Sequence, residues 1–432
     1  MSGRHAVVVG GGIGGLAAAV ALRRRSWQVT VLEKQSSISE IGAGITLWPN
    51  ALRALDALGV GSEIRSSGLA QISGGIRDSH GKWLSRTDTD AMARRFGDGM
   101  VVLDRGNLLS VLREAATGTE IRTSAEVSAV DKHATVTITS PQTGAGERIR
   151  GDVVIGADGV WSAVRASLWP DAQVRPVGMT AWRLIGRVTD EGNVEGGESW
   201  GRGDYAGLTP LADNRIYAWF VTPVSARAPT DPNESLAWLR QRFGSWHTPL
   251  PELLKNAQPE DLLRNELHDL EPLGSLVCGH VALVGDAAHA MTPNLGQGAC
   301  LALEDGVELA SALDQNTALD QNTALDQNTV PSGDIAPSGD IALDQNTALD
   351  QNTALDQNTV PSGDIARQLR IYDRRRLPRV HRIVNRSRTA GTAAALRSRT
   401  LITVRNALVT AIPAAMSLRA LNPVVGWRPP QG

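Results

Sequence analysis

The stretch His5-Ala-Val-Val-Val-Gly10-Gly-Gly12-Ile-Gly-Gly15 decides the fold of this chain of 432 residues. A β-branched run leads into clustered glycines and then into helix-forming residues, which predicts a strand, a tight turn and a helix. Gly10, Gly12 and Gly15 take the three positions of a dinucleotide-binding turn. The first permits the turn, the second lets the backbone approach a pyrophosphate, and the third packs the helix against the strand. The free N–H groups that begin the helix are then expected to face the phosphates.

A second strand, Gln28–Leu32, ends at Glu33, which follows Gly10 by 23 residues. An acid at this position accepts hydrogen bonds from ribose hydroxyls and repels a 2′-phosphate. The strand, helix and acid together predict dinucleotide binding. They do not by themselves distinguish NAD from FAD.

Two later segments repeat the order strand, Gly-rich turn, helix. The first contains Asp158-Gly159, and the second contains Gly285-Asp286 followed by Gly296-Gln-Gly-Ala-Cys300. A carboxylate at the end of a strand, here Asp286, can accept a hydrogen bond from a ribityl hydroxyl. The Gly-rich helix start after it offers backbone N–H groups to a flavin or a phosphate.

With these motifs the chain resembles the class A flavoprotein monooxygenases, which include salicylate-, hydroxybenzoate- and urate-type hydroxylases. The resemblance implies that FAD is the cofactor. It also implies that Gly42–Thr46 lies along the flavin, that Arg105 reaches the phosphates, and that the backbone at Val127 meets the adenine. The expected FAD-binding residues are Gly10, Gly12, Gly14, Gly15, Glu33, Lys34, Thr46, Arg105, Val127, Asp158, Asp286, Gly296, Gln297, Gly298, Ala299 and Cys300. His289 is expected to be structural.

The expected fold class is α/β, with a Rossmann-like FAD-binding lobe interleaved with an antiparallel-sheet substrate lobe and followed by C-terminal helices. Alternating apolar and polar residues with Gly, Pro and Asp turns predict the antiparallel strands. The expected domains are 1–70, 100–170 and 280–311 for FAD, 71–99 and 171–279 for substrate, 312–366 as a repetitive disordered loop, and 367–432 as a C-terminal helical region.

The substrate pocket is expected between the two lobes, the usual place for a small ligand. No catalytic acid or base can be assigned from the sequence. The pocket candidates are Arg183, Tyr205, Trp219 and Pro293, with Trp182 and Phe220 as further aromatic candidates.

An exact repeat interrupts the chain, because the 25-residue block at 312–336 recurs at 342–366. Its Ala-Leu-Asp-Gln-Asn-Thr units carry too little apolar surface to build a core. A single 13-residue copy would suffice as a helix connection and would leave 42 surplus residues. We expect an expanded surface loop, since the entropy of loop closure grows only logarithmically with length. The alternative is a repeat that binds a partner.

Composition narrows the class of protein. A net charge of −2, with 42% hydrophobic and 20% charged residues, is ordinary for a globular protein and argues against a nucleic-acid partner. Two cysteines, Cys278 and Cys300, form neither a disulfide framework nor a metal site, which favours a reducing, cytoplasmic location.

Three segments invite other interpretations. The run 6–22 is too short and too rich in glycine to be a membrane span or a signal peptide. The run 401–421 contains two arginines and a proline, so a packed amphipathic helix pair is favoured over stable membrane insertion. The nine arginines between 367 and 388 favour a solvated helical face over a nucleic-acid patch.

By resemblance, the protein uses NAD(P)H and O2 to hydroxylate a small, aromatic or other electron-rich substrate through a C4a-hydroperoxyflavin. NAD(P)H is a transient co-substrate, because no second dinucleotide-binding pattern is visible, and the protein is expected to be a monomer or a homodimer. The alternatives are an epoxidase, a Baeyer-Villiger enzyme, a flavin reductase, a halogenase and a non-catalytic FAD-binding protein. The lack of a WxWxIP-like segment weighs against the halogenase.

Overall fold

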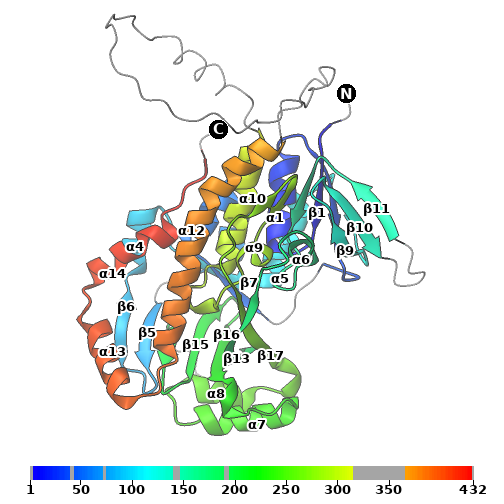
Figure 1. Cartoon of the computed structure of the whole chain (residues 1–432). Helices are drawn as coiled ribbons and strands as arrows, with labels where there is room; N and C mark the ends of the chain where they lie inside the picture. The colour runs from blue at the N-terminus through cyan, green and yellow to red at the C-terminus, as the bar shows by residue number, and fades with distance from the viewer. Residues whose placement is uncertain are drawn as a thin grey trace, which may run out of the picture.

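The computed structural model describes residues 3–38, 43–71, 74–139, 146–188, 194–314 and 365–430 (Figure 1). An upper lobe contains β1, α1 and α10, a lower lobe contains β13, β16 and β17, and the long helix α12 runs along both. Most of the repeat, residues 315–364, lies outside the described residues.

The upper lobe is built on a six-stranded sheet whose central strands are parallel. β1 pairs with β2 on one side and with β12 on the other, and β12 pairs with β19. These strands are almost wholly buried, as expected for a parallel sheet covered on both faces. Their carboxyl ends therefore meet at one edge, and each of the three glycine motifs begins at that edge. In sheet order the strands are β18 (Val277–Cys278), β19 (Val281–Leu283), β12 (Val153–Gly156), β1 (His5–Val9), β2 (Gln28–Leu32) and β8 (Glu120–Arg122).

Helices pack closely on this sheet. A Cβ on Gly306 of α10 would lie 2.8 Å from the carbonyl carbon of Ala17 in α1, so the two helices approach backbone to backbone. Two three-stranded sheets complete the lobe. The first consists of β9 (Glu126–Val130), β10 (Thr135–Thr139) and β11 (Gly146–Arg150). The second consists of β3 (Gly44–Leu47), β7 (Met100–Asp104) and β4 (Leu69–Gln71). The helices are α1 (Ile13–Arg23), α2 (Pro49–Leu58), α3 (Gly61–Ser67), α5 (Arg105–Ala115), α6 (Ala163–Leu168), α9 (Asp286–His289) and α10 (Gly298–Asp314), with the short 3₁₀ helix η3 (Pro293–Leu295).

The lower lobe is a seven-stranded sheet. Residues 71–99 contribute its last two strands, so this segment joins the same sheet as the distant residues 171–279. The pairing is antiparallel throughout except between β14 and β5, which run parallel. In sheet order the strands are β17 (Leu263–Leu270), β13 (Val174–Gly186), β16 (Arg215–Pro223), β15 (Tyr205–Leu211), β14 (Gly197–Trp200), β5 (Gly74–Asp78) and β6 (Trp83–Thr87).

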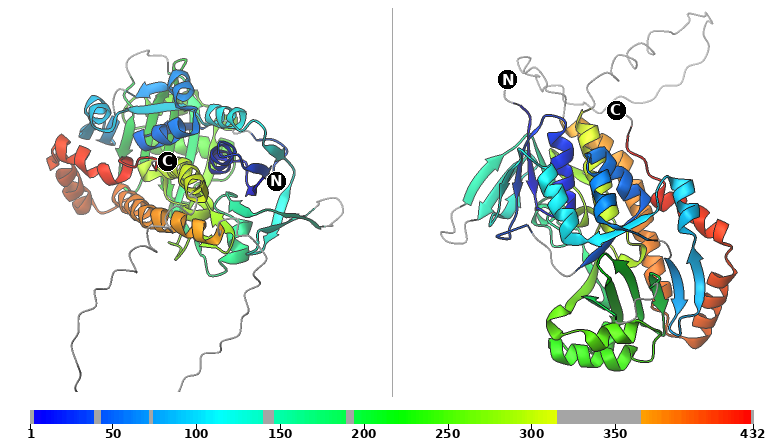
Figure 2. Two further views of the ribbon diagram at one scale, coloured as in Figure 1. Left: turned by 90° about the horizontal axis from the view of Figure 1, so that it is seen from above. Right: turned by 180° about the vertical axis from the view of Figure 1, so that it is seen from behind.

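One face of the lower sheet is covered by two helices (Figure 2). Trp182 and Phe220 point into this apolar core and are fully buried. The expectation that these two aromatics line the pocket is therefore wrong, because alternation along the strands turns them to the opposite face. The covering helices are α7 (Pro232–Phe243) and α8 (Leu250–Asn256), with the 3₁₀ helices η1 (Val224–Ala226) and η2 (Pro259–Asp261) beside them.

The C-terminal part is helical, as expected. α12 packs on α10, and its Arg376 is fully buried in ion pairs with Glu304 and Asp305 of α10. The arginine-rich stretch is thus only partly a solvated face, because α10 presents carboxylates to it. The remaining helices are α4 (Thr89–Phe96), α12 (Ile365–Ala394), α13 (Arg399–Ala411), α14 (Ala414–Ala420) and α15 (Asn422–Val425).

Candidate functional site

The first glycine turn combines tight backbone packing with one open position. Gly10 has a φ of 107°, and a Cβ on it would lie 2.3 Å from the carbonyl oxygen of Ala157. A Cβ on Gly15 would lie 1.9 Å from the carbonyl oxygen of Gly10. A Cβ on Gly12, in contrast, would meet no atom of the described chain within 4 Å. The turn therefore leaves room directly in front of the N-terminus of α1, where a phosphate group fits.

Glu33 stands at the side of this turn. Its Oε2 accepts a hydrogen bond of 2.7 Å from the Gly11 N–H, and its Oε1 accepts one from the Gln35 N–H. The Ala125 N–H donates to the Glu33 carbonyl, which brings the start of β9, including Val127, to the same end of the sheet. Lys34 follows on the surface. This cluster contains the residues that we expect to contact the ribose and the adenine.

The Gly285-Asp286 turn lies on the other side of α1. Gly285 has a φ of 58°, and Asp286 is exposed with one carboxylate oxygen 3.9 Å from where a Cβ on Gly298 would stand. α10 begins at Gly298, so the carboxylate and the free N–H groups of that helix lie together. Gly14 of α1 lies close to the same helix, since a Cβ on it would be 3.4 Å from the Ala302 side chain of α10.

A buried ionic network holds this second turn. Asp305 accepts hydrogen bonds from the Gly285 N–H at 2.9 Å and from His289 Nε2 at 2.7 Å, and Arg376 Nε donates to its other oxygen at 2.8 Å. Burial raises the pKa of Asp305, but the charge of Arg376 and the contact with His289 outweigh it and lower the pKa to about 2. His289 thus serves the fold of the turn. The sequence did not indicate Asp305 and Arg376, which are 71 residues apart.

Asn50 of α2 extends the network toward the Gly-rich helix start. Its amide nitrogen donates to Gln297 Oε1 at 2.9 Å and to Glu304 Oε1 at 2.7 Å. Cys300 is buried near the carbonyls of Thr46 and Gly296, and burial raises the pKa of its thiol to about 12. The thiol is therefore neutral and packs as a small apolar group.

The loop around Thr46 and the start of α5 are joined by strand pairing. Gly44 of β3 lies opposite Asp104 of β7, and the Arg105 N–H donates to the Ala43 carbonyl at 3.0 Å. Arg105 is thereby held beside the loop that resembles the flavin-contacting segment.

Asp158 has its contacts within its own turn. Its carboxylate accepts hydrogen bonds from the Ser162 hydroxyl and the Val164 N–H at the start of α6. Arg165 of the same helix donates to the carbonyl of Ala287 in α9 at 2.9 Å. The Asp158-Gly159 motif therefore shapes its turn and ties it to the Gly285-Asp286 motif.

The lower sheet presents a second face to the upper lobe. Arg183 of β13 pairs with Trp219 of β16, and both side chains alternate with the buried residues of the opposite face. Tyr217, two residues from Trp219, packs against β3, since a Cβ on Gly44 would lie 2.7 Å from its ring. Arg183 is hydrogen-bonded to the Tyr217 hydroxyl. The sheet therefore places a cation and two aromatic rings opposite the predicted flavin loop.

Glu198 completes this face and was missed by the sequence analysis. Trp200 Nε1 donates to its carboxylate at 2.6 Å, and the Trp219 indole donates to it as well. Trp219 reaches it by lying across Gly207, where a Cβ would be 2.0 Å from the indole ring. Burial raises the pKa of Glu198 to about 7, and the two indole donors oppose this only in part. In the sequence, Glu198 was marked only by being an acidic residue among strand-forming residues.

Tyr205 and Pro293 lie near one another at the end of this face. Tyr205 is buried and its hydroxyl lies beside Asn294 in η3, while Pro293 itself is exposed. Burial raises the pKa of Tyr205, so its hydroxyl stays protonated. The structure thus brings together Arg183, Tyr205 and Trp219, with Pro293 at the border.

The donor groups fit FAD. The open space at Gly12, the carboxylates of Glu33 and Asp286, and the N-termini of α1 and α10 supply what phosphates, ribose and ribityl hydroxyls and a flavin ring require. Together with the fold, they define an FAD-binding protein.

Comparisons with known proteins identify the family. The sequence profile described as "FAD binding domain" matches residues 4–326. An aurachin C monooxygenase/isomerase of Stigmatella aurantiaca is 34% identical over 313 residues, which cover 72% of this chain and 81% of the relative. A 3-hydroxybenzoate 6-hydroxylase of Polaromonas naphthalenivorans is 35% identical over 325 residues, covering 72% and 79%.

Solved structures agree with this result. The crystal structure of Klebsiella pneumoniae HpxO complexed with FAD and uric acid matches with a TM-score of 0.77 at 25% identity, covering 98% of this chain and 96% of that one. The chain belongs to the class A FAD-dependent aromatic hydroxylase and monooxygenase family. The expected fold class, the FAD cofactor and the oxidoreductase class are confirmed.

Proposed function

We propose that this monooxygenase uses NAD(P)H and O2 to hydroxylate a small aromatic substrate, with FAD supplying the chemistry of the C4a-hydroperoxyflavin. The observation that carries the proposal is the face formed by Arg183, Glu198, Tyr217 and Trp219, which lies opposite the Gly44 loop. Aromatic rings and a cation suit a flat, electron-rich substrate that carries a phenolic or acidic group. Relatives named for urate and 3-hydroxybenzoate act on such compounds.

Each lobe has its own task under this proposal. The upper lobe holds FAD through the open turn at Gly12, the carboxylates of Glu33 and Asp286, and the backbone from Gly296 to Cys300, while Asp158 shapes the turn beside them. The lower sheet holds the substrate and keeps water from the reacting atoms, which protects a reactive oxygen donor from decay. The backbone N–H groups from Gly298 to Cys300 begin a helix and stabilise negative charge on the reduced cofactor.

Glu198 is the group that we propose to accept a proton from the substrate. Its pKa of about 7 lets the carboxyl exchange protons near neutral pH, whereas an ordinary glutamate would be fully ionised there. Arg183 would stabilise the anion formed by loss of that proton. The two indole donors keep the carboxylate in place.

The experiment is a substrate screen with the purified, FAD-loaded protein. NAD(P)H oxidation, H2O2 release and product mass are followed with phenols, aromatic acids, purines and polyketides. We expect at least one aromatic compound to accelerate NAD(P)H oxidation and to gain one oxygen atom on its ring. Oxygen insertion only into alkenes or ketones, or flavin reduction without any oxygenated product, would contradict the proposal.

A further inference from the structure

The helices α13 and α14 carry an unusual apolar surface. Among the described residues, eight large hydrophobic side chains are exposed, and five of them lie between positions 401 and 416. We call these five the apolar C-terminal face. Its members are Leu401 (54% exposed), Val404 (50%), Leu408 (63%), Ile412 (48%) and Met416 (57%). The expected helix pair is present, but this side of it is not packed.

The opposite side of the pair is firmly attached. Both helices contact the edge strand β6, and Figures 1 and 2 show them on the outer side of β5 and β6. Arg405 is buried, donates to the carbonyls of Ala393 and Ala394, and lies over the Trp200 ring at 5.0 Å. The exposed apolar side chains therefore belong to a fixed element. Leu401, Val404 and Leu408 follow helical spacing along one stripe.

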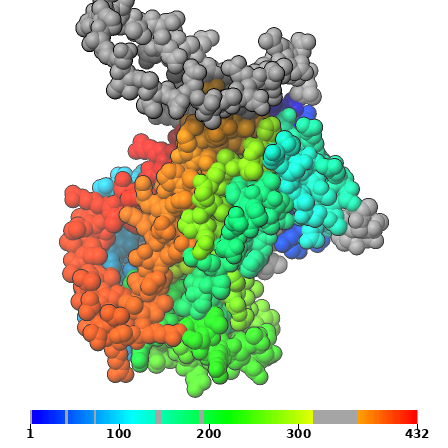
Figure 3. All heavy atoms as spheres, viewed as in Figure 1, coloured from blue at the N-terminus to red at the C-terminus, as the bar shows by residue number. Residues whose placement is uncertain are grey.

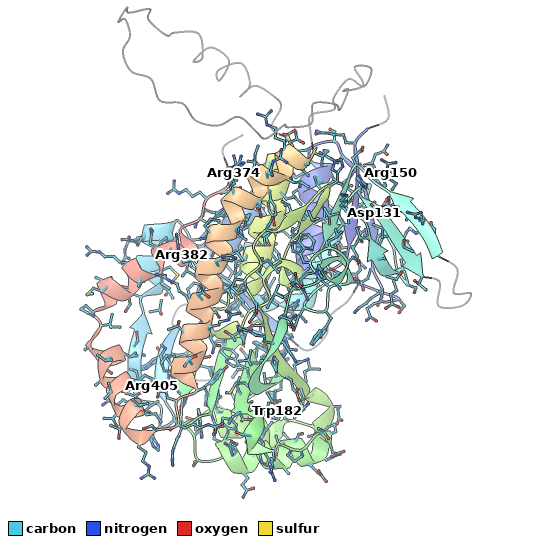
Figure 4. All side chains as sticks on the ribbon, viewed as in Figure 1. Asp131, Arg150, Trp182, Arg374, Arg382 and Arg405 are labelled. Atoms are coloured by element: carbon cyan, nitrogen blue, oxygen red, sulfur yellow. The ribbon has the colours of Figure 1, made fainter. Side chains whose placement is uncertain are left out.

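The surroundings of this face are basic. Residues 374–432 contain twelve arginines and no aspartate or glutamate, although the whole chain has a net charge of −2. Some of these arginines are paired, since Arg376 and Arg379 bind Glu304 and Arg388 binds Asp269. Four exposed arginines lie beside the apolar C-terminal face: Arg399 on α13, Arg419 on α14, Arg397 just before α13, and Arg386, which donates to the Ala420 carbonyl. Figure 4 shows Arg382 on the long helix α12 and Arg405 in the C-terminal part.

The geometry of these helices differs from that of a straight membrane span. In the described part of the chain no single helix is both long and apolar enough to cross a bilayer, and the pair 399–425 is bent by 97°. The 13 residues of α13 extend about 20 Å, well below the roughly 30 Å of a hydrocarbon core. A bent, apolar pair flanked by arginines instead matches helices that lie in the plane of a membrane interface.

A second copy of the chain is the other natural occupant, and the charges disfavour it. A two-fold interface would place the same arginines against each other, and like charges oppose such an association. Anionic phosphates complement them. We propose that the apolar C-terminal face and the arginines around it dock the protein onto the surface of an anionic phospholipid bilayer. The C-terminal helices form one outer side of the molecule (Figure 3) and contact β6, so docking would bring the substrate sheet close to the lipid.

The test measures sedimentation of the full, FAD-loaded chain with vesicles. Vesicles of phosphatidylcholine that contain a minority of phosphatidylglycerol should bind the protein, and pure phosphatidylcholine should bind it about tenfold less. Raising the salt from about 0.1 M to about 0.5 M should also weaken binding, because salt screens the arginines. Equal binding to both vesicle types, or none to either, would overturn the proposal.

Variants link the binding to this face. The triple change Leu401→Ser, Leu408→Ser and Met416→Ser should reduce vesicle binding at least about tenfold. The change Leu69→Ser, at an exposed apolar site on β4 of the upper lobe, should leave it unchanged. Bound FAD and thermal stability report that each variant is folded. If the triple variant still binds vesicles, or if it only converts a dimer to a monomer, the face has another role and the proposal fails.

Discussion

The indole nitrogen of Trp200 donates a hydrogen bond of 2.6 Å to the carboxylate of Glu198, two residues earlier on the same strand. Residues two apart on a strand share a face, so both side chains lie on the sheet face that also carries Trp219. Trp219 adds a second indole donor from a neighbouring part of the sheet. Partial burial raises the pKa of this carboxyl to about 7, and the two neutral indole donors oppose the rise only in part.

Replacing Glu198 by glutamine should slow hydroxylation. The amide keeps an oxygen that can accept the indole hydrogen bonds, but it cannot take up a proton. We expect kcat to fall about 100-fold and the rise of activity through neutral pH to disappear. Steady-state rates across pH with the best substrate from the screen measure both effects. A variant that keeps the wild-type pH profile would remove Glu198 from the proton transfer.

The same substitution should change how stability depends on pH. The pKa of Glu198 is raised by folding, so the proton stabilises the native state below the ordinary pKa of 4.5, and this contribution is lost as the pH rises through about 7. Glu198→Gln should therefore be as stable as the wild type near pH 4.5 and more stable above pH 7, by roughly 2 °C in Tm. Thermal melts of both proteins at the two pH values check this prediction. A wild-type protein that gains stability over the variant at high pH would contradict it.

Two glycines of the first turn should respond oppositely to alanine. Gly12→Ala adds a methyl group to open space, so the apoprotein should keep its stability while FAD affinity falls at least about tenfold. Gly15→Ala would place a methyl group 1.9 Å from a carbonyl oxygen and should impair folding itself. Flavin titration and melting of the apoproteins distinguish the two outcomes. Equal loss of stability in both variants would refute the assignment of Gly12 to the cofactor.

Two aspartates near the second turn should also respond differently to substitution by alanine. Asp286 is exposed, so Asp286→Ala should lose FAD with little change in apoprotein stability. Asp305→Ala leaves Arg376 and His289 without their shared partner and should cost about 3–5 kcal/mol. Denaturant unfolding of the apoproteins and the flavin absorbance of purified samples measure these effects. Full retention of FAD by the Asp286 variant would refute its contact.

The sequence alone determined which edge of the upper sheet is expected to bind the cofactor. The turns at Gly10, Asp158 and Gly285 each follow a strand directly, and a turn's geometry depends on residues adjacent in the chain. Parallel strands then bring these turns to one edge, so the FAD site could be predicted without coordinates. The pairing of the lower strands was predicted in type but not in detail.

Only the tertiary structure decided the substrate face, the ionic network and the apolar C-terminal face. Arg183 and Trp219 become neighbours through sheet order and register, which depend on packing between segments far apart in the chain. For the same reason Trp182 was wrongly placed in the pocket, since one residue of register separates the two faces of a strand. Whether a helix buries its apolar side depends on what lies beside it, and no local pattern between 401 and 421 contains that information.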